Sequence, residues 1–145
     1  MHRRGLILAS IAALMTTPGL AAEPPKPDVD PAVTLSPVAL PIIVDGRLAN
    51  YIFVTVKIKL TRSADEAALR DKEPYFRDAL VRAAHRTPFV LRYDYNHVDA
   101  GRLRAVMLHE AGAISGPNTI RDIVVVDQTP QHRIPSPRTP QPNSP

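Results

Sequence analysis

The stretch YIFVTVKIKL, residues 51–60, alternates strictly between two kinds of side chain. Its even-numbered positions are all apolar: Ile52, Val54, Val56, Ile58 and Leu60. Its odd-numbered positions begin aromatic and end charged: Tyr51, Phe53, Thr55, Lys57 and Lys59. Because successive side chains of a β-strand point to opposite faces of a sheet, this alternation predicts a strand with one buried and one exposed face.

A second strand is predicted just before it, over residues 33–44, where apolar side chains recur up to Val44. Pro37 and Pro41 interrupt this stretch, and proline in a strand is typical of an edge position with a bulge or a break. The dipeptide Asp45-Gly46 then favours a tight turn. The two strands are therefore expected to form an antiparallel hairpin.

Residues 63–86 change to a helical period. Ser63 is the expected N-cap, and Pro74 is expected either to divide the stretch or to start a second helix in its first turn. The buried side follows the spacing i, i+3, i+4, i+7 with Phe76, Ala79, Leu80 and Ala83. This segment therefore predicts at least one amphipathic helix that packs on the sheet.

The second half of the chain continues with a short extended or irregular connection over residues 87–98. A helix is expected to follow, with Asp99 as its cap, Leu103, Val106 and Met107 on its buried side, and Gly112 at its end. Residues 119–128 are rich in β-branched side chains and predict a last strand. The order β-β-α-α-β predicts an α+β domain, a small antiparallel three-stranded sheet with the helices on one face.

The two ends of the chain are not expected to join this domain. Residues 1–22 combine a basic start, an apolar run and the small residues Gly19, Ala21 and Ala22, which is the layout of a secretory signal. The run is short for a bilayer span of about 20 residues, and an uncleaved inner-membrane tether is the alternative. Residues 23–32 predict a proline-rich linker, and residues 129–145 a disordered proline-rich tail, which leaves 33–128 as the domain. The domain is expected to face the periplasm in either case.

Composition excludes several classes of protein. Without Arg3 and Arg4 of the signal segment, 16 basic residues stand against 14 acidic ones. This mixed charge, with only 5% aromatic residues, does not suit a nucleic-acid binder, which needs a dense basic face. The absence of cysteine excludes disulfides, thiolate zinc sites and cysteine nucleophiles.

Motifs for catalysis or metal binding are not recognised either. His109 and Glu110 are adjacent, so on a helix their side chains point apart instead of sharing a ligand. Ser63 and Ser115 are explained by a cap and a turn, and no glycine-rich phosphate loop is present. We therefore expect no enzymatic activity, no catalytic residue, no cofactor and no metal site.

Four segments together resemble the flagellar basal body-associated protein family FliL. They are YIFVTVKIKL, KEPYFRDALVRAAHR, DAGRLRAVML and TIRDIVVVDQTPQ, and the resemblance covers about residues 35–131. The matching features are Pro74 followed by Arg77-Asp78-Ala79, a pattern of Gly101, Leu103 and Arg104 that is one residue shorter than Gly-x-x-Leu-Arg, and a glutamine end at Gln128 or Gln131.

The resemblance implies a stomatin-like periplasmic domain that assembles into homo-oligomers and contacts the flagellar stator or basal body to support motility. Two features depart from the family, which has a full transmembrane helix and ends close to its last strand. The alternative is therefore a small exported binding or envelope protein unrelated to flagella. Six interaction residues are expected on exposed surfaces, from the two helices and from the YDYNH stretch: Arg77, Arg82, Arg102, Arg104, Tyr93 and Tyr95.

Overall fold

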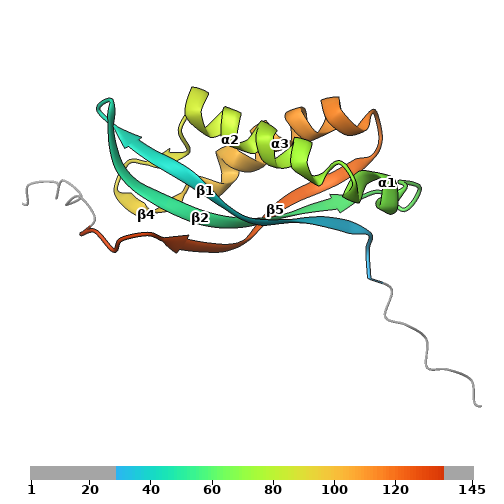
Figure 1. Ribbon diagram of the computed structural model, residues 1–145, viewed down its shortest axis with the longest axis horizontal. Coiled ribbons are helices and arrows are strands. Elements are labelled where there is room, and N and C mark those ends of the chain that lie inside the picture. The colour runs from blue at the N-terminus through green and yellow to red at the C-terminus, as the bar shows by residue number, and fades with distance from the viewer. Residues whose placement is uncertain (1–28, 136–145) are drawn as a thin grey trace, which may run out of the picture.

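The computed structural model describes residues 29–135, and Figure 1 shows them as a long twisted sheet with helices on one side. The elements are β1 (Ala32–Val44), β2 (Arg47–Leu60), α1 (Glu66–Arg70), α2 (Glu73–Arg86), β3 (Val90–Leu91), β4 (Asp94–Val98), α3 (Ala100–Ser115) and β5 (Ile120–Pro130). The predicted α+β class is confirmed. The predicted signal segment, most of the linker, and the tail from residue 136 onward lie outside the described residues.

The main sheet has the strand order β1-β2-β5, with β2 antiparallel to both neighbours. The predicted hairpin is confirmed, and its turn has positive φ at Asp45 (50°) and Gly46 (72°), which suits the twist of a two-residue hairpin turn. β1 is an edge strand with a register shift between Leu35 and Val38, where Pro37 cannot donate to a ladder. The predicted break in this strand is thus confirmed.

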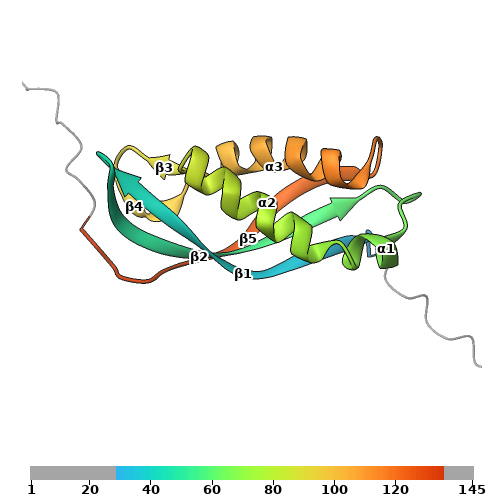
Figure 2. The ribbon, with the colours of Figure 1, turned by 45° about the horizontal axis from the view of Figure 1, so that its top comes forward.

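The apolar face of β2 forms the centre of the core. Its five even-numbered side chains are fully buried, together with side chains from both long helices, among them Phe76, Leu80, Leu103 and Met107. Figure 2 shows α2 lying over β1 and α3 over β5, on the same side of the sheet. The helices therefore cover the face that the alternation in residues 51–60 predicted.

The region after β2 holds two helices, and the predicted cap is wrong. Oδ1 of Asp65 accepts from the backbone N–H of Ala68 at 3.0 Å, whereas the hydroxyl of Ser63 lies 3.4 Å from that of Thr61. Because α1 begins at Glu66, the acceptor that reaches its first turn belongs to the residue directly before it. Pro74 lies in the first turn of α2, which confirms the prediction that it starts a second helix.

The predicted end of the last helix at Gly112 is also wrong. α3 continues to Ser115, and its C-cap is Gly116, which has a φ of 92° and donates its N–H to the carbonyl of Gly112 at 2.9 Å. Gly112 keeps helical geometry because Ala111, directly before it, is buried and Ile114, two residues after it, packs against the core. The predicted cap is confirmed, since Oδ1 of Asp99 accepts from the N–H of Arg102 at 2.9 Å.

The connection between α2 and α3 contains a small antiparallel hairpin of β3 and β4. Figure 1 shows β4 at the same end of the molecule as the β1–β2 turn, and β4 contacts both β2 and β5. The sequence predicted a short extended or irregular connection here, and the extended form is confirmed. This hairpin positions the polar site described below.

The ordered domain continues past the boundary predicted at Gln128. β5 ends at Pro130, and the following backbone is hydrogen-bonded up to Ile134. The sequence does not reveal this continuation, because the backbone after β5 bonds to the side chains of Asn50 and Asn96. Such contacts leave no periodic pattern in the sequence. Among the helices of residues 29–135, none is sufficiently long and apolar to cross a membrane.

Candidate functional site

Asn50 lies at the centre of a polar site at the hairpin end of the domain. Its side chain is only 3% exposed, and within residues 29–135 it is the one polar residue that is buried. Its Nδ2 donates to the carbonyl of Tyr95 at 3.1 Å and to that of His132 at 2.8 Å. Its Oδ1 accepts from the N–H of Tyr51 at 2.9 Å and from that of His132 at 3.3 Å. These bonds offset the cost of burying an amide and join β2, β4 and the C-terminal segment.

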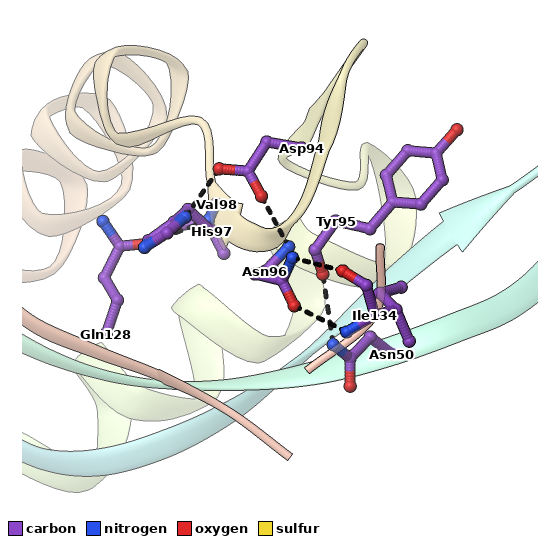
Figure 3. Close-up of polar contacts among 8 residues, drawn as sticks. All are labelled: Asn50, Asp94, Tyr95, Asn96, His97, Val98, Gln128 and Ile134. Atoms are coloured by element: carbon purple, nitrogen blue, oxygen red, sulfur yellow. Dashed lines mark hydrogen bonds and ion pairs between the residues drawn. The ribbon is translucent and has the colours of Figure 1, made fainter. Parts of the chain in front are cut away.

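Asn96 repeats this arrangement two residues further along the C-terminal segment. Its Nδ2 donates to the carbonyl of Ile134 at 2.8 Å, and its Oδ1 accepts from the N–H of Ile134 at 3.0 Å. Figure 3 shows both asparagine side chains pointing at backbone atoms of other segments. We call Asn50 and Asn96 the asparagine clamp, and residues 131–135 the strap.

Side chains of β4 and β5 fix the position of the clamp. The N–H of Asn96 donates to Oδ1 of Asp94 at 2.8 Å, and Nδ1 of His97 lies 2.6 Å from the other carboxylate oxygen (Figure 3). Burial raises the pKa of Asp94, but hydrogen bonds from the Asn96 backbone and from His97 outweigh it, so that the pKa lies below its ordinary value. Oε1 of Gln128 accepts from the N–H of Val98 at 2.8 Å and joins β4 to β5.

A polar pocket of about 330 Å³ opens between β4 and the strap. Its lining comes from both segments and from β5: Asp94, Asn96, His97, Gln128, Pro130, Arg133 and Ile134. Within residues 29–135 no group of three or more histidine, aspartate or glutamate side chains could hold a metal ion. The pocket can therefore offer hydrogen bonds and a mixed charge to a small polar group.

The two predicted tyrosines lie beside this site. Tyr93 is 38% exposed in the turn between β3 and β4, whereas Tyr95 packs against the core and contributes its backbone carbonyl to Asn50. The YDYNH stretch therefore lies next to the polar site, and its role in an interaction stays a prediction. The residue of that stretch that holds another segment is Asn96, which the sequence prediction did not select.

The four predicted arginines do not form one surface. On α2, Arg77 pairs with Glu73 at 2.9 Å and Arg82 pairs with Asp78. The two arginines lie five positions apart, which separates them by about 140° around the helix. They therefore point in different directions.

The α3 arginines are separated in the same way. Arg104 donates to Asp122 of β5 at 2.7 Å, and Arg102 is exposed two positions before it, about 200° away around the helix. Burial raises the pKa of Asp122, but the hydrogen bonds from Arg104 and from the Ile123 backbone and the charges of Arg104 and Lys59 together lower it. Arg104 thus serves first to join α3 to β5.

The second candidate surface is the outer sheet face, which we define by Tyr51, Phe53, Thr55, Lys57 and Lys59 of β2. In the described part of the chain no helix covers this face (Figure 1). Phe53 is 41% exposed there and lies opposite Ala39 of β1 and Thr129 of β5. At the other end Lys59 lies opposite Asp122. The lysine end is therefore partly neutralised, and the aromatic end is left exposed and apolar.

One signal for the clamp was present in the sequence. Asn50 continues the even-numbered series of β2 and so occupies a buried position with a polar side chain. A buried amide requires partners, which predicts a second segment against that end of the strand. Its partner at His132 lies 82 positions away, and spacing alone does not reveal such a contact.

No model of a known protein family matches this chain, and the search of functionally described proteins found no significant sequence match.

Proposed function

We propose that this chain is a non-enzymatic, exported protein of the bacterial cell envelope that binds copies of itself and the flagellar stator or basal body, as FliL-family proteins do. The observation that carries the proposal is the order of the longer elements, the β1–β2 hairpin, α2, α3 and β5, combined with a sheet face that no described helix covers. The longer elements follow the order that the resemblance implies, with α1 and the β3–β4 hairpin in addition, and the open face offers a surface for assembly. A stomatin-like fold is part of the proposal.

Exposed apolar side chains of the sheet support an assembly surface. Phe53 on the outer sheet face is 41% exposed, and Val126 of β5, the extra residue at the register shift between Thr55 and Val56 of β2, is 50% exposed. Exposed apolar side chains that form a patch are typical of sites where another protein binds. β5 is also an edge strand of the sheet, and an edge strand offers backbone groups that a second sheet can pair with.

The proposed location is the periplasm, with export directed by residues 1–22 and an inner-membrane tether as the alternative. The support is the basic start followed by an apolar run and small residues. No nucleic acid and no cofactor are part of the proposal.

The polar pocket favours a second candidate function, a small exported binding or envelope protein unrelated to flagella. A pocket of about 330 Å³ lined by Asp94, His97, Gln128 and Arg133 can receive a small polar ligand. The two functions make different demands, since the first needs a partner on the surface and the second a ligand in the pocket.

Co-purification from the native host tests the two functions against each other. The chain is tagged at its C-terminus, the envelope fraction is isolated, and the recovered proteins and the mass of the mature chain are determined together. Recovery of stator or basal-body proteins supports the flagellar role, and the mass shows whether residues 1–22 are removed. Recovery of the chain without any motor protein contradicts that role and favours the second function.

A further inference from the structure

The asparagine clamp holds the strap entirely through main-chain atoms. Asn50 bonds both the N–H and the carbonyl of His132, at 3.3 and 2.8 Å, and Asn96 does the same for Ile134, at 3.0 and 2.8 Å. The chain bends at Gln131 and His132, and the two contacted residues are two apart, the spacing of residues that share one edge of an extended strand. Each side-chain amide thus pairs with the strap as a neighbouring β-strand would.

These contacts define the class of occupant that the clamp accepts. The occupant must be an extended peptide with a free N–H at two alternate positions, which excludes proline at both. The second position also favours an apolar side chain, because Ile134 is half-buried. Pro130 directly precedes the strap and Pro135 is its last residue, and their fixed φ angles limit the conformations the strap can adopt when it is released.

The strap can leave the clamp without unfolding the domain. The last backbone bond that continues the sheet runs from the N–H of Gln131 to the carbonyl of Tyr51, at 2.8 Å. The buried core residues all precede the strap in the sequence. Segments that follow the last strand of a domain open at far lower cost than the core. When the strap of another copy enters, the same four clamp bonds form again, so the exchange is nearly balanced in energy.

We propose that the asparagine clamp is a receptor for an extended peptide, and that in the self-associated protein it binds the strap of a second copy. The clamp and the strap are present in every copy, so each strap fits each clamp, which is the condition for exchange of an identical segment between protomers. This inference rests on the self-association in the proposed function and identifies the segment that links the copies.

Single-cysteine copies test the exchange in the full-length chain, which has no cysteine of its own. His97 on β4 and Arg133 in the strap line the same pocket, so His97→Cys and Arg133→Cys place thiols within reach of a short bismaleimide. The two variants are mixed and cross-linked, and we expect a covalent heterodimer. The double variant in one chain is the geometric control, and a dilute sample of it, in which the copies are separate, should cross-link internally at the monomer mass.

The clamp is tested by a further substitution made in both copies. Asn96→Ala removes the two bonds that hold Ile134 in its own clamp, so the strap is released more easily and the heterodimer should form roughly tenfold faster. Tyr75→Ala is the matched control, because Tyr75 is 65% exposed on α2, and it should leave the rate unchanged. A second pairing, Thr34→Cys with Arg133→Cys, measures cross-linking from random collisions.

Each outcome decides the proposal. A heterodimer yield at the random-collision level, with the double variant cross-linked internally, contradicts the exchange. If light scattering shows oligomers in that same sample, self-association stands and only the exchange is wrong. If the sample is monomeric at all concentrations, both the exchange and the self-association are wrong. If the double variant does not cross-link internally in a dilute sample of separate copies, the place of the strap in the clamp is contradicted.

Discussion

Nδ2 of Asn50 lies 2.8 Å from the carbonyl oxygen of His132, so a buried side chain of the central strand holds the backbone of the C-terminal segment. Asn50→Ala removes this bond and also removes the bond from Nδ2 to the carbonyl of Tyr95. We expect the free energy of unfolding to fall by about 1–3 kcal/mol, because buried polar groups lose their partners. Urea denaturation measures the change.

Gln131→Ala is the matched control for this variant. Gln131 is exposed and takes part in the site through its backbone N–H, which the substitution keeps. Its unfolding free energy should stay within about 0.5 kcal/mol of wild type, the usual range for surface substitutions. An Asn50→Ala protein that is as stable as Gln131→Ala would show that the clamp contributes nothing to the fold.

Asp94 makes the stability of this end of the domain depend on acid. Its pKa in the folded protein lies below the ordinary value, so its contribution is present above about pH 4 and is lost as pH falls through the folded pKa. Asp94→Asn should be less stable than wild type at pH 7, and the difference should shrink as the pH is lowered toward 2. Urea denaturation at a series of pH values measures this.

His97→Gln checks the cause of that dependence. Removing the imidazole takes away one of the hydrogen bonds that lower the pKa of Asp94, so the acid-dependent loss should be smaller than in wild type and should be complete at a higher pH. Direct titration of the Asp94 carboxyl by NMR in both proteins gives the answer. An unchanged titration would show that His97 does not hold this carboxylate in solution.

Gly116 and Gly112 should respond to alanine in opposite directions. Gly116 has a φ of 92° at the end of α3, where a side chain is strained, so Gly116→Ala should cost about 1–3 kcal/mol. Gly112 lies inside the helix, and a Cβ there meets nothing within 4 Å, so Gly112→Ala should gain about 0.5–1 kcal/mol. Thermal denaturation of the pair tests whether α3 ends at Gly116, and equal effects would contradict this.

Phe53 should be more important for assembly than for folding. Phe53→Glu places a charge on the exposed end of the outer sheet face and should weaken self-association, while the buried face of β2 is unchanged. Tyr75→Glu is the control, since it adds the same charge at a 65% exposed aromatic residue on α2. Light scattering over a concentration series compares the two variants, and equal association in both would exclude the sheet face as the interface.

Charge reversal on the helices tests the earlier prediction for the arginines. Arg82 pairs with Asp78 on the surface of α2, and such exposed pairs contribute about 0–1 kcal/mol. Arg82→Glu combined with Arg102→Glu should therefore leave the domain folded and weaken assembly if these residues contact a partner. Circular dichroism reports the fold, and unchanged size and unchanged partner recovery would count against an interface on the helices.

Local patterns in the sequence predicted most of the fold. The period-2 alternation of residues 51–60, the Asp45-Gly46 turn, Asp99 as a cap and the β-branched last strand are all confirmed. Ser63 and Gly112 were wrong because several residues near each helix end can serve as a cap, and the tertiary packing of the helix selects among them.

The candidate site was less accessible from the sequence. Asn50 and Asn96 are clamp residues because the C-terminal segment returns to them, and that contact depends on the tertiary fold. The arginines were selected for exposure and charge, but intramolecular ion pairs satisfy Arg77, Arg82 and Arg104. Charge patterning does not reveal whether an ion pair forms within the chain or with a partner.

Motility of the native host tests the central claim most directly. The measurement is the swimming speed of a strain that lacks this chain, complemented either with wild type or with Phe53→Glu. We expect slow swimming in the deletion strain, recovery with wild type, and little recovery with Phe53→Glu although that variant is exported and folded. Normal swimming in the deletion strain would contradict a role in the flagellar motor.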